Sequence, residues 1–326
     1  MKCTNRLRLF TGFLCIAILL TGCGYNKYDM PYTADSKISS FSIVKTQVSK
    51  ETADSFAHSL CVVEENTDSD SIPITTGTGA ALFDINGRNA LYSKKMFETM
   101  HPASLTKIMT SIVALNNATP DTMLTASSNV KNLEPGAQVI NLNEGDKMTL
   151  DQALHILLIY SANDVAVMIA EGIGGNVDNF VNMMNEEALR IGATNSHFTN
   201  PHGLTSDDHY TTPYDLYLMM NEASKFELFN EIIHTMDYQT IYYDVAGNEK
   251  SVNISNTNQY MIGEIKAPAG ITVLGGKTGT TNAAGHCLIL LSKDIKSQPY
   301  ISIILNSQSR DEMYQYMNAL LSKIGN

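Results

Sequence analysis

The chain has 326 residues, of which 44% are hydrophobic and 17% charged, and its formal net charge is −11. With this share of apolar side chains the chain can bury a sizeable core, which excludes an intrinsically disordered protein. The excess of acidic residues excludes the basic surface on which nucleic acids are bound, so we expect no nucleic-acid partner.

The first 22 residues are typical of a secretory signal peptide. Lys2, Arg6 and Arg8 come first, without any acidic residue, and the apolar run LFTGFLCIAILL follows them. This run is too short for a membrane-spanning helix, which needs roughly 20 apolar residues. We therefore expect a signal peptide that is removed on export, rather than a terminal core helix. Losing its three basic residues takes the formal charge from −11 to −14.

The sequence LTGC at residues 20–23 resembles the cleavage box of bacterial lipoproteins. In that class the cysteine thiol receives a diacylglycerol and becomes the new N-terminus. The resemblance implies that Cys23 is lipidated and anchors the chain on the extracytoplasmic face of the bacterial plasma membrane; the alternative is an ordinary signal peptide with a chance cysteine. Residues 23–58 are polar with little periodicity, so we predict a tether between the anchor and a folded domain at 59–326.

The predicted domain begins with short apolar runs separated by turn residues, a pattern that indicates strands. Asn86-Gly87 between two such runs predicts a hairpin. A three-and-four spacing of apolar residues after Ser104 predicts an amphipathic helix. The early strands are predicted at 59–63, 79–85 and 90–93, with a polar loop at 64–78.

The middle of the chain is predicted to be helical and the last part to return to strands. A threonine cap at Thr149 and a proline at Pro213 mark two helix starts. The helices are expected at 149–160, 164–171, 178–190, 213–221 and 310–323, and the later strands at 240–245, 271–281, 285–293 and 300–308. Strands at both ends of a helical middle predict one α/β unit with an antiparallel sheet.

Two cysteines, Cys61 and Cys287, remain after the leader, Cys23 and the tether are set aside. They could form one disulfide or stay as buried free thiols, because each lies in an apolar run. His197, His202 and His209 crowd one stretch, but neither H-E-x-x-H nor a zinc-type cysteine spacing is present. We therefore interpret these histidines as turn or cleft-rim residues and expect no metal.

The stretch HPASLTKIMT places Ser104 and Lys107 one helical turn apart at the start of the predicted helix. A serine at a helix N-terminus has backbone N–H groups directed at whatever its hydroxyl attacks, which suits a developing oxyanion. A buried lysine can lose its proton and then accept the proton of the serine. Ser-x-x-Lys is common by chance, however, and a capping serine with a solvent-exposed lysine would also explain it.

Two further motifs follow in the chain. YSANDVA places Ser161 and Asn163 between two predicted helices, where a turn can direct a hydroxyl and an amide into a cleft. GGKTGTT places Lys277, Thr278 and Gly279 in a predicted strand, whose glycines allow a substrate backbone to approach its edge. Taken singly these are ordinary caps and turns, but the three motifs in this order are hard to obtain by accident.

The set S-x-x-K, S-x-N and K-T-G resembles the signature of penicillin-binding proteins and serine β-lactamases. The stretches HPASLTKIMT, YSANDVAVMIAE, HFTNPHGL, HYTTPYDL and GGKTGTTNAAGHCLI resemble, within that superfamily, the low-molecular-mass D-alanyl-D-alanine carboxypeptidases. The resemblance implies an α/β (α+β) fold of the β-lactamase/transpeptidase type. In that fold an antiparallel five-stranded sheet is flanked by helices and joined by a mostly helical subdomain.

The resemblance also implies a role for each motif residue, without a cofactor. Ser104 would attack the carbonyl between two terminal D-alanines of a peptidoglycan stem peptide, with Lys107 as the base. The Ser161 hydroxyl, helped by Lys277, would pass a proton to the leaving D-alanine, and Asn163 would bind the substrate amide. The resemblance assigns three further residues to substrate binding: Thr278 and Thr280 hold the terminal carboxylate, and Gly279 lies between them. The N–H groups of Ser104 and Thr280 would form the oxyanion hole, and β-lactams would acylate Ser104.

Three alternatives use a similar site. A class A β-lactamase would need a glutamate in an E-x-x-L-N motif, and no glutamate between the second and third motifs lies in one. It would also have S-D-N as its second motif, where this chain has S-A-N. A D,D-endopeptidase or transpeptidase would use identical residues. A non-catalytic penicillin-sensing lipoprotein would tolerate the loss of a motif residue. All the motif residues are present in this chain, which favours an enzyme over a sensor.

Overall fold

The computed structural model of the protein describes residues 60–63, 66 and 72–325. The predicted signal peptide, Cys23 and the predicted tether lie outside these residues, as do residues 64–65 and 67–71 of the predicted loop at 64–78. None of the helices in the described ranges is long and apolar enough to cross a membrane.

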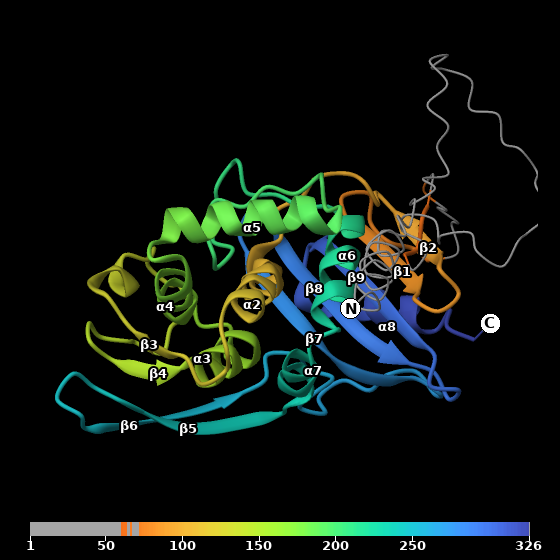
Figure 1. Ribbon diagram of the computed structural model, residues 1–326. Coiled ribbons are helices and arrows are strands. Elements are labelled where there is room, and N and C mark those ends of the chain that lie inside the picture. Colours follow the sequence, from red (N-terminus) through yellow and green to blue (C-terminus); the bar gives the residue numbers. More distant parts are fainter. Residues whose placement is uncertain (1–59, 64–65, 67–71, 326) are drawn as a thin grey trace, which may run out of the picture. The chain divides into compact units, whose positions relative to one another are not determined.

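A five-stranded antiparallel sheet forms one part of the fold (Figure 1). Its strand order is β2-β1-β9-β8-β7, and each strand runs antiparallel to its neighbours. The strands are β1 (Gly79–Asp84), β2 (Asn89–Lys94), β7 (Thr272–Thr281), β8 (Gly285–Lys293) and β9 (Pro299–Ser307). This arrangement confirms the predicted α/β fold with an antiparallel five-stranded sheet.

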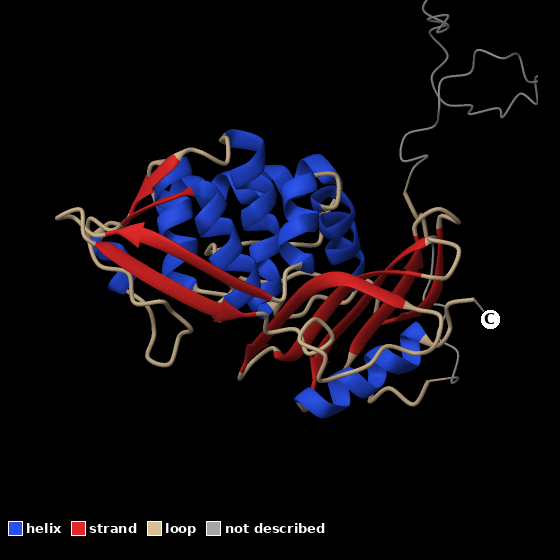
Figure 2. Ribbon diagram, turned by 90° about the horizontal axis from the view of Figure 1, so that it is seen from below, coloured by secondary structure: helices blue, strands red, loops and turns tan. Residues whose placement is uncertain are grey.

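Both faces of the sheet are covered, which explains why β8 and β9 are apolar along most of their length. Leu288, Leu290 and Ile304 pack on one face with the C-terminal helix α8 (Arg310–Leu321). Ile289, Ile301 and their alternating neighbours belong to the larger core shared with the other helices. Figure 2 shows α8 on the outer face of the sheet and the helical block on the opposite side.

The helical part consists of α2 (Thr106–Asn117), α3 (Leu150–His155), α4 (Asn163–Gly174), α5 (Val177–Ile191), α6 (Pro213–Ala223) and α7 (Glu227–His234). It is built around α2, which packs against α4, α5 and α6. Thr149 caps α3 through a reciprocal capping box with Gln152, and Pro213 begins α6, so both predicted helix starts are confirmed. The sequence did not predict α7.

The predicted helix at 149–160 changes character in its second half. After α3 the chain forms a wider π-helical turn at Ile156–Tyr160, and Ser161 then takes a left-handed conformation with φ of 70°. The wider turn and the left-handed residue end the helix abruptly, because a right-handed helix cannot continue through such a residue. They place Ser161 in the short connection that leads into the next helix at Asn163.

A second, smaller sheet lies beside the helices and has the order β3-β4-β5-β6. The sequence predicted only one of its strands, at 240–245. The strands are β3 (Met123–Thr125), β4 (Lys147–Thr149), β5 (Asp237–Tyr243) and β6 (Glu249–Ser255). The first two are too short to show an alternating pattern, and β6 is rich in polar residues.

The predicted strand at 59–63 is wrong for its described residues, which form no strand. The Cys61 N–H donates to the Tyr217 hydroxyl at 2.9 Å, and the Tyr214 hydroxyl donates to the Cys61 carbonyl at 2.9 Å. Two tyrosines of α6 therefore satisfy the backbone groups that a sheet would otherwise pair. Cys61 and Cys287 are both buried free thiols, which settles the question that the sequence left open.

Candidate active site

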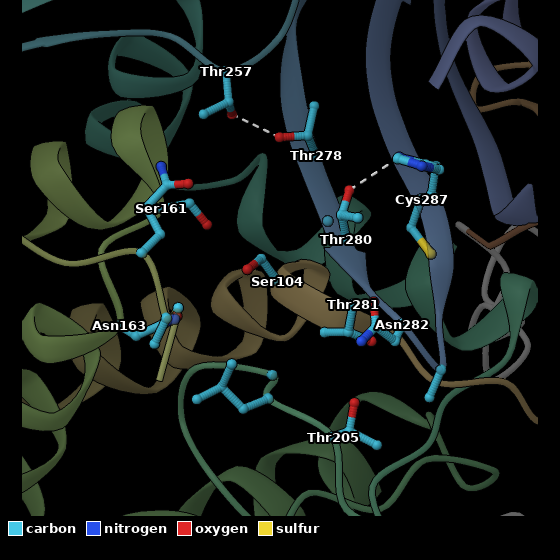
Figure 3. A pocket seen from close by; sticks show the side chains of 18 of the residues that line it. Ser104, Ser161, Asn163, Thr205, Thr257, Thr278, Thr280, Thr281, Asn282 and Cys287 are labelled. Atoms are coloured by element: carbon cyan, nitrogen blue, oxygen red, sulfur yellow. Dashed lines mark hydrogen bonds between the residues drawn. The ribbon is translucent and has the colours of Figure 1, made fainter. Parts of the chain in front are cut away.

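A cavity of about 580 Å³ lies between the helical part and the edge strand β7 of the five-stranded sheet. Six of the predicted catalytic and substrate-binding residues line it: Ser104, Ser161, Asn163, Thr278, Gly279 and Thr280. Figure 3 shows the Ser104 side chain in the middle of this cavity, with Ser161 and Asn163 on one side and Thr280 on the other. The structure therefore brings the three sequence motifs together.

Ser104 lies in a short 3₁₀ turn (Ala103–Leu105) that leads into α2. Ala103 before it has a φ of +48°, a left-handed conformation that alanine rarely adopts. Gly279 of β7 lies so close to this turn that a Cβ placed on it would be 2.9 Å from the Ser104 nitrogen. The absence of a side chain at Gly279 thus allows the strand and the serine turn to touch.

Lys107 lies below the cavity floor and is fully buried. Its Nζ atom lies 2.9 Å from Ser104 Oγ, 2.7 Å from Asn163 Oδ1 and 2.7 Å from the carbonyl oxygen of His202. Burial lowers the pKa of this amine well below its usual range, and the charge of Lys277 lowers it further. The site therefore favours an uncharged amine next to the serine hydroxyl.

The three neighbours of Lys107 suit such an uncharged amine. The carbonyl of His202 and the amide oxygen of Asn163 can only accept hydrogen bonds, so they take the two amine hydrogens. The lone pair of the nitrogen is then left for the third neighbour, the hydroxyl of Ser104. In this arrangement the serine donates to the lysine, which is the geometry a proton transfer requires.

Ser161 is buried at the cavity wall, and its hydroxyl has no hydrogen-bond partner in the described part of the chain. Asn163 begins α4, and its backbone N–H donates to the Gln138 carbonyl at 2.7 Å. The loop that contains Gln138 also lines the cavity. An unpaired buried hydroxyl is costly unless a bound molecule satisfies it, so Ser161 is available to a substrate.

Lys277 is fully buried in β7 behind the cavity wall, and its Nζ atom donates to the Thr278 carbonyl at 3.0 Å. Burial lowers the pKa of Lys277 to about 7. The Thr278 hydroxyl lies 2.6 Å from that of Thr257, and the Thr280 hydroxyl lies 3.3 Å from Nδ1 of His286 (Figure 3). Strand β7 thus presents two hydroxyls in the cavity, with a lysine behind them.

Sequence reasoning missed several residues that shape the site. Arg310, at the start of α8, and Glu134 are the only Asp, Glu, Lys or Arg residues among those that line the cavity. The backbone carbonyl of His202, which accepts a hydrogen bond from Lys107, could not be predicted from the sequence, because every residue has a carbonyl. Of the two interpretations of His209, as a turn or a cleft-rim residue, the turn is confirmed, because its N–H donates to the Ser206 carbonyl at 3.0 Å. The rim is wrong, since the side chain is buried and bonded to Thr106. The stretches HFTNPHGL and HYTTPYDL resemble the carboxypeptidases, but nothing in them indicated contacts with α2.

Comparison with known proteins places these features in a family. Residues 65–309 match the family described as D-alanyl-D-alanine carboxypeptidase. The chain belongs to this family. This confirms the resemblance that the three motifs indicated; the predicted lipoprotein signal precedes the matched residues.

Two curated members of the family illustrate its extent. D-alanyl-D-alanine carboxypeptidase DacF of Bacillus subtilis is 34% identical over 218 residues, which are 66% of this chain and 53% of DacF. D-alanyl-D-alanine carboxypeptidase DacB2 of Mycobacterium tuberculosis is 29% identical, over 66% of this chain and 70% of that protein. The chain thus spans about half the length of DacF.

The fold has close counterparts among solved structures. The DD-transpeptidase of Streptomyces K15 superposes with a TM-score of 0.70 at 25% sequence identity, over 77% of this chain and 98% of that one. The carboxypeptidase DacD of Francisella tularensis superposes with a TM-score of 0.66, over 81% of this chain and 72% of that one. The sheet and the helical part therefore follow the family fold.

Proposed function

We propose that the chain is a serine D,D-carboxypeptidase that removes the terminal D-alanine from peptidoglycan stem peptides and is acylated by β-lactams. The observation that carries the proposal is the position of Lys107 Nζ, which touches Ser104 Oγ while two acceptors take its hydrogens. Membership of the family and the agreement of fold support the same activity.

In the proposed acylation, Ser104 Oγ bonds to the carbonyl carbon of the penultimate D-alanine as its proton moves to Lys107 Nζ. The electron pair of the carbonyl goes to its oxygen, which we expect between the N–H groups of Ser104 and Thr280. The close contact of Gly279 with the Ser104 nitrogen supports this position, because it brings the two backbones side by side.

The tetrahedral intermediate then loses its amine. The carbon–nitrogen bond breaks, the nitrogen receives through the Ser161 hydroxyl the proton that Lys107 took from Ser104, and free D-alanine departs, which leaves Lys107 uncharged again. Ser161 suits this role because its buried hydroxyl has no other partner among the described residues. Water then adds to the ester, with Lys107 accepting its proton, and the break of the ester bond restores the Ser104 hydroxyl.

The terminal carboxylate of the substrate fits the β7 side of the cavity. The hydroxyls of Thr278 and Thr280 line this side, Lys277 lies behind it, and Arg310 adds a guanidinium at its rim. A cation and hydroxyl donors on one side of the nucleophile select a substrate that ends in a carboxylate. Asn163 lies on the opposite side, where its NH₂ group can bind the acyl part of the peptide.

Acylation by labelled penicillin and release of D-alanine test the proposal together. The wild-type protein should gain the mass of one penicillin, and Ser104→Ala should gain none. A pentapeptide ending in D-alanyl-D-alanine should release D-alanine, and Lys107→Ala should not release it above background. Labelling without release would favour a sensor, transfer to an added amine would favour a transpeptidase, and rapid hydrolysis of the penicillin would favour a β-lactamase.

We also propose that the domain is exported and held at the outer face of the plasma membrane by lipid on Cys23. The support is the leader sequence and the LTGC box alone. A diacylglycerol supplies two acyl chains, enough for stable anchoring at ~0.8 kcal/mol per buried CH₂. Cys23→Ala should move the protein from the membrane fraction to the soluble fraction, and an unchanged distribution would contradict lipidation.

A further inference from the structure

The nucleophile follows a strained residue, and the structure contains a specific support for the strain. Ala103 has a φ of +48°, in a region that costs a non-glycine residue about 1–3 kcal/mol. Such a conformation persists only when its surroundings enforce it. Because Ser104 is the next residue, the direction of its hydroxyl depends on the peptide that Ala103 holds.

The carbonyl oxygen of Ala103 is held from two sides. The Thr106 hydroxyl donates to it at 2.8 Å. Gly203 lies directly against it, since a Cβ placed on Gly203 would be 1.9 Å from this oxygen. The backbone N–H of Thr106 also donates to this oxygen, so the peptide between Ala103 and Ser104 is fixed by two hydrogen bonds and one close backbone contact.

A buried histidine orients the Thr106 hydroxyl. His209 Nε2 lies 2.8 Å from Thr106 Oγ1. The hydroxyl has one proton, which it gives to the Ala103 carbonyl, so His209 must donate its Nε2 hydrogen to the hydroxyl oxygen. Nδ1 of His209 then accepts the Thr199 N–H at 3.1 Å, as the neutral ring with hydrogen on Nε2 requires.

His209 is itself anchored to the segment before the nucleophile. The Nδ1 atom of His101 lies 2.9 Å from the His209 carbonyl, within hydrogen-bond distance. His209 and Thr106 are both buried, with at most 1% of either residue exposed. Neither residue lines the cavity, so neither can touch a substrate there.

We propose that Thr106 and His209 are positioning residues, whose hydrogen bond holds Ala103 in its left-handed conformation and so aligns Ser104 with Lys107 and with β7. This inference rests on the proposed acylation of Ser104. Without the Thr106 hydroxyl, the Ala103 carbonyl loses its side-chain donor and keeps the backbone N–H of Thr106, while the buried Nε2–H of His209 loses its acceptor. The turn can then relax, and a displacement of about 1 Å at a nucleophile can cost about a hundredfold in rate.

The test compares Thr106→Val, which removes the hydroxyl at nearly constant shape, with Thr106→Ser, which keeps it. Thr211→Val is the matched control, because Thr211 is equally buried and lies two residues from His209, and its hydroxyl bonds to Ser196 at 2.7 Å rather than to Ala103. Acylation by a fluorescent penicillin is followed over a range of concentrations, which separates the first-order acylation rate from the half-saturating concentration. Thermal unfolding of each variant is recorded alongside.

We expect Thr106→Val to acylate at least tenfold more slowly, with a half-saturating concentration within threefold of wild type. Thr106→Ser should recover most of the rate, and Thr211→Val should lose less than threefold. His209→Leu should match Thr106→Val, and it replaces that variant if the valine form does not fold.

An acylation rate in Thr106→Val within threefold of wild type would overturn the inference. So would a loss that Thr106→Ser fails to recover, or a loss that Thr211→Val shares at equal thermal stability. If the wild-type protein is not acylated at all, the proposed function itself fails, and this outcome is seen before any variant is compared.

Discussion

The amide oxygen of Asn163 lies 2.7 Å from Nζ of Lys107. This hydrogen bond links the start of α4 to the first turn of α2 directly below the nucleophile. We predict that Asn163→Asp, which places a carboxylate at this position, raises the pKa of Lys107 because an opposite charge favours the ammonium form. The acylation rate by penicillin at pH 7 should then fall by about a hundredfold, the range expected for the loss of a general base.

The control for this prediction is Asn163→Ala, which removes the same amide without adding charge. Both variants lose the NH₂ group that faces the cavity, so the midpoint of the acidic limb of the pH profile is compared rather than the absolute rate. Only Asn163→Asp should move this midpoint to higher pH. An unchanged midpoint in the aspartate variant would mean that Lys107 is not the group whose proton limits acylation.

The two buried lysines predict a bell-shaped pH dependence of acylation. At low pH Lys107 gains a proton and can no longer act as a base, so the rate falls as the pH drops through its lowered pKa. As the pH rises through about 7, Lys277 loses the charge that attracts the carboxylate of a substrate or β-lactam. Second-order acylation rates measured from pH 5 to 10 should therefore decline on both sides.

Lys277→Arg separates the two limbs of this profile. A guanidinium keeps its proton where a buried lysine loses it, so the alkaline decline should shift to higher pH or disappear while the acidic limb stays. The absolute acylation rate is expected to fall because arginine is larger than lysine, but the pH at which the alkaline decline occurs does not depend on the absolute rate. An alkaline limb that remains near pH 7 in this variant would assign it to another group.

The sequence predicted those parts of the site that a local pattern marks. Ser104 and Lys107 are joined by one helical turn, and the spacing of apolar residues identifies α2 as a buried helix. The glycines around Lys277 lie in a strand whose β-branched and apolar residues are equally visible. For these elements the local preference and the final fold agree, which is why they could be predicted without a structure.

The remaining parts depend on contacts between distant segments. The His202 carbonyl reaches Lys107 from 95 residues away, and no residue type marks a backbone oxygen as a ligand. The left-handed conformation of Ala103 is imposed by Gly203 and Thr106, since alanine itself disfavours it. Histidine is intermediate in its preference for burial, so the sequence could place His209 at a turn but could not show that its side chain is buried against Thr106.

Arg310 gives a prediction about substrate selection. Arg310 lines the cavity near His286, whose ring contacts the Thr280 hydroxyl, and the other charged residue of the lining is Glu134. We predict that Arg310→Gln raises KM for a pentapeptide ending in a D-alanine carboxylate by about 10- to 100-fold, the loss expected for one charged hydrogen bond. Steady-state release of D-alanine measures this change.

A peptide whose terminal carboxylate is replaced by an amide provides the control. The wild-type protein should strongly prefer the carboxylate, and Arg310→Gln should lose most of this preference. Glu134→Gln, which also removes one charge from the cavity lining, should keep it. If Arg310→Gln discriminates between the two peptides as well as wild type, the carboxylate is bound elsewhere.

The contact between Gly203 and the Ala103 carbonyl predicts an unusually costly glycine substitution. Gly203 has a φ of +86° and Gly247, in the turn after β5, has a φ of +82°, so alanine is strained at both positions. Gly247→Ala should lower the free energy of unfolding by about 1–2 kcal/mol, the cost of the left-handed backbone alone. No steric term is added, because nothing lies within 4 Å of its added Cβ. Gly203→Ala should lose a further ~1–3 kcal/mol, since its Cβ meets a backbone oxygen that can move only with the nucleophile turn.

Urea denaturation measures both changes, and penicillin labelling should fall in Gly203→Ala alone. Equal losses of stability with full labelling in both variants would show that the turn at Ala103 yields without disturbing Ser104.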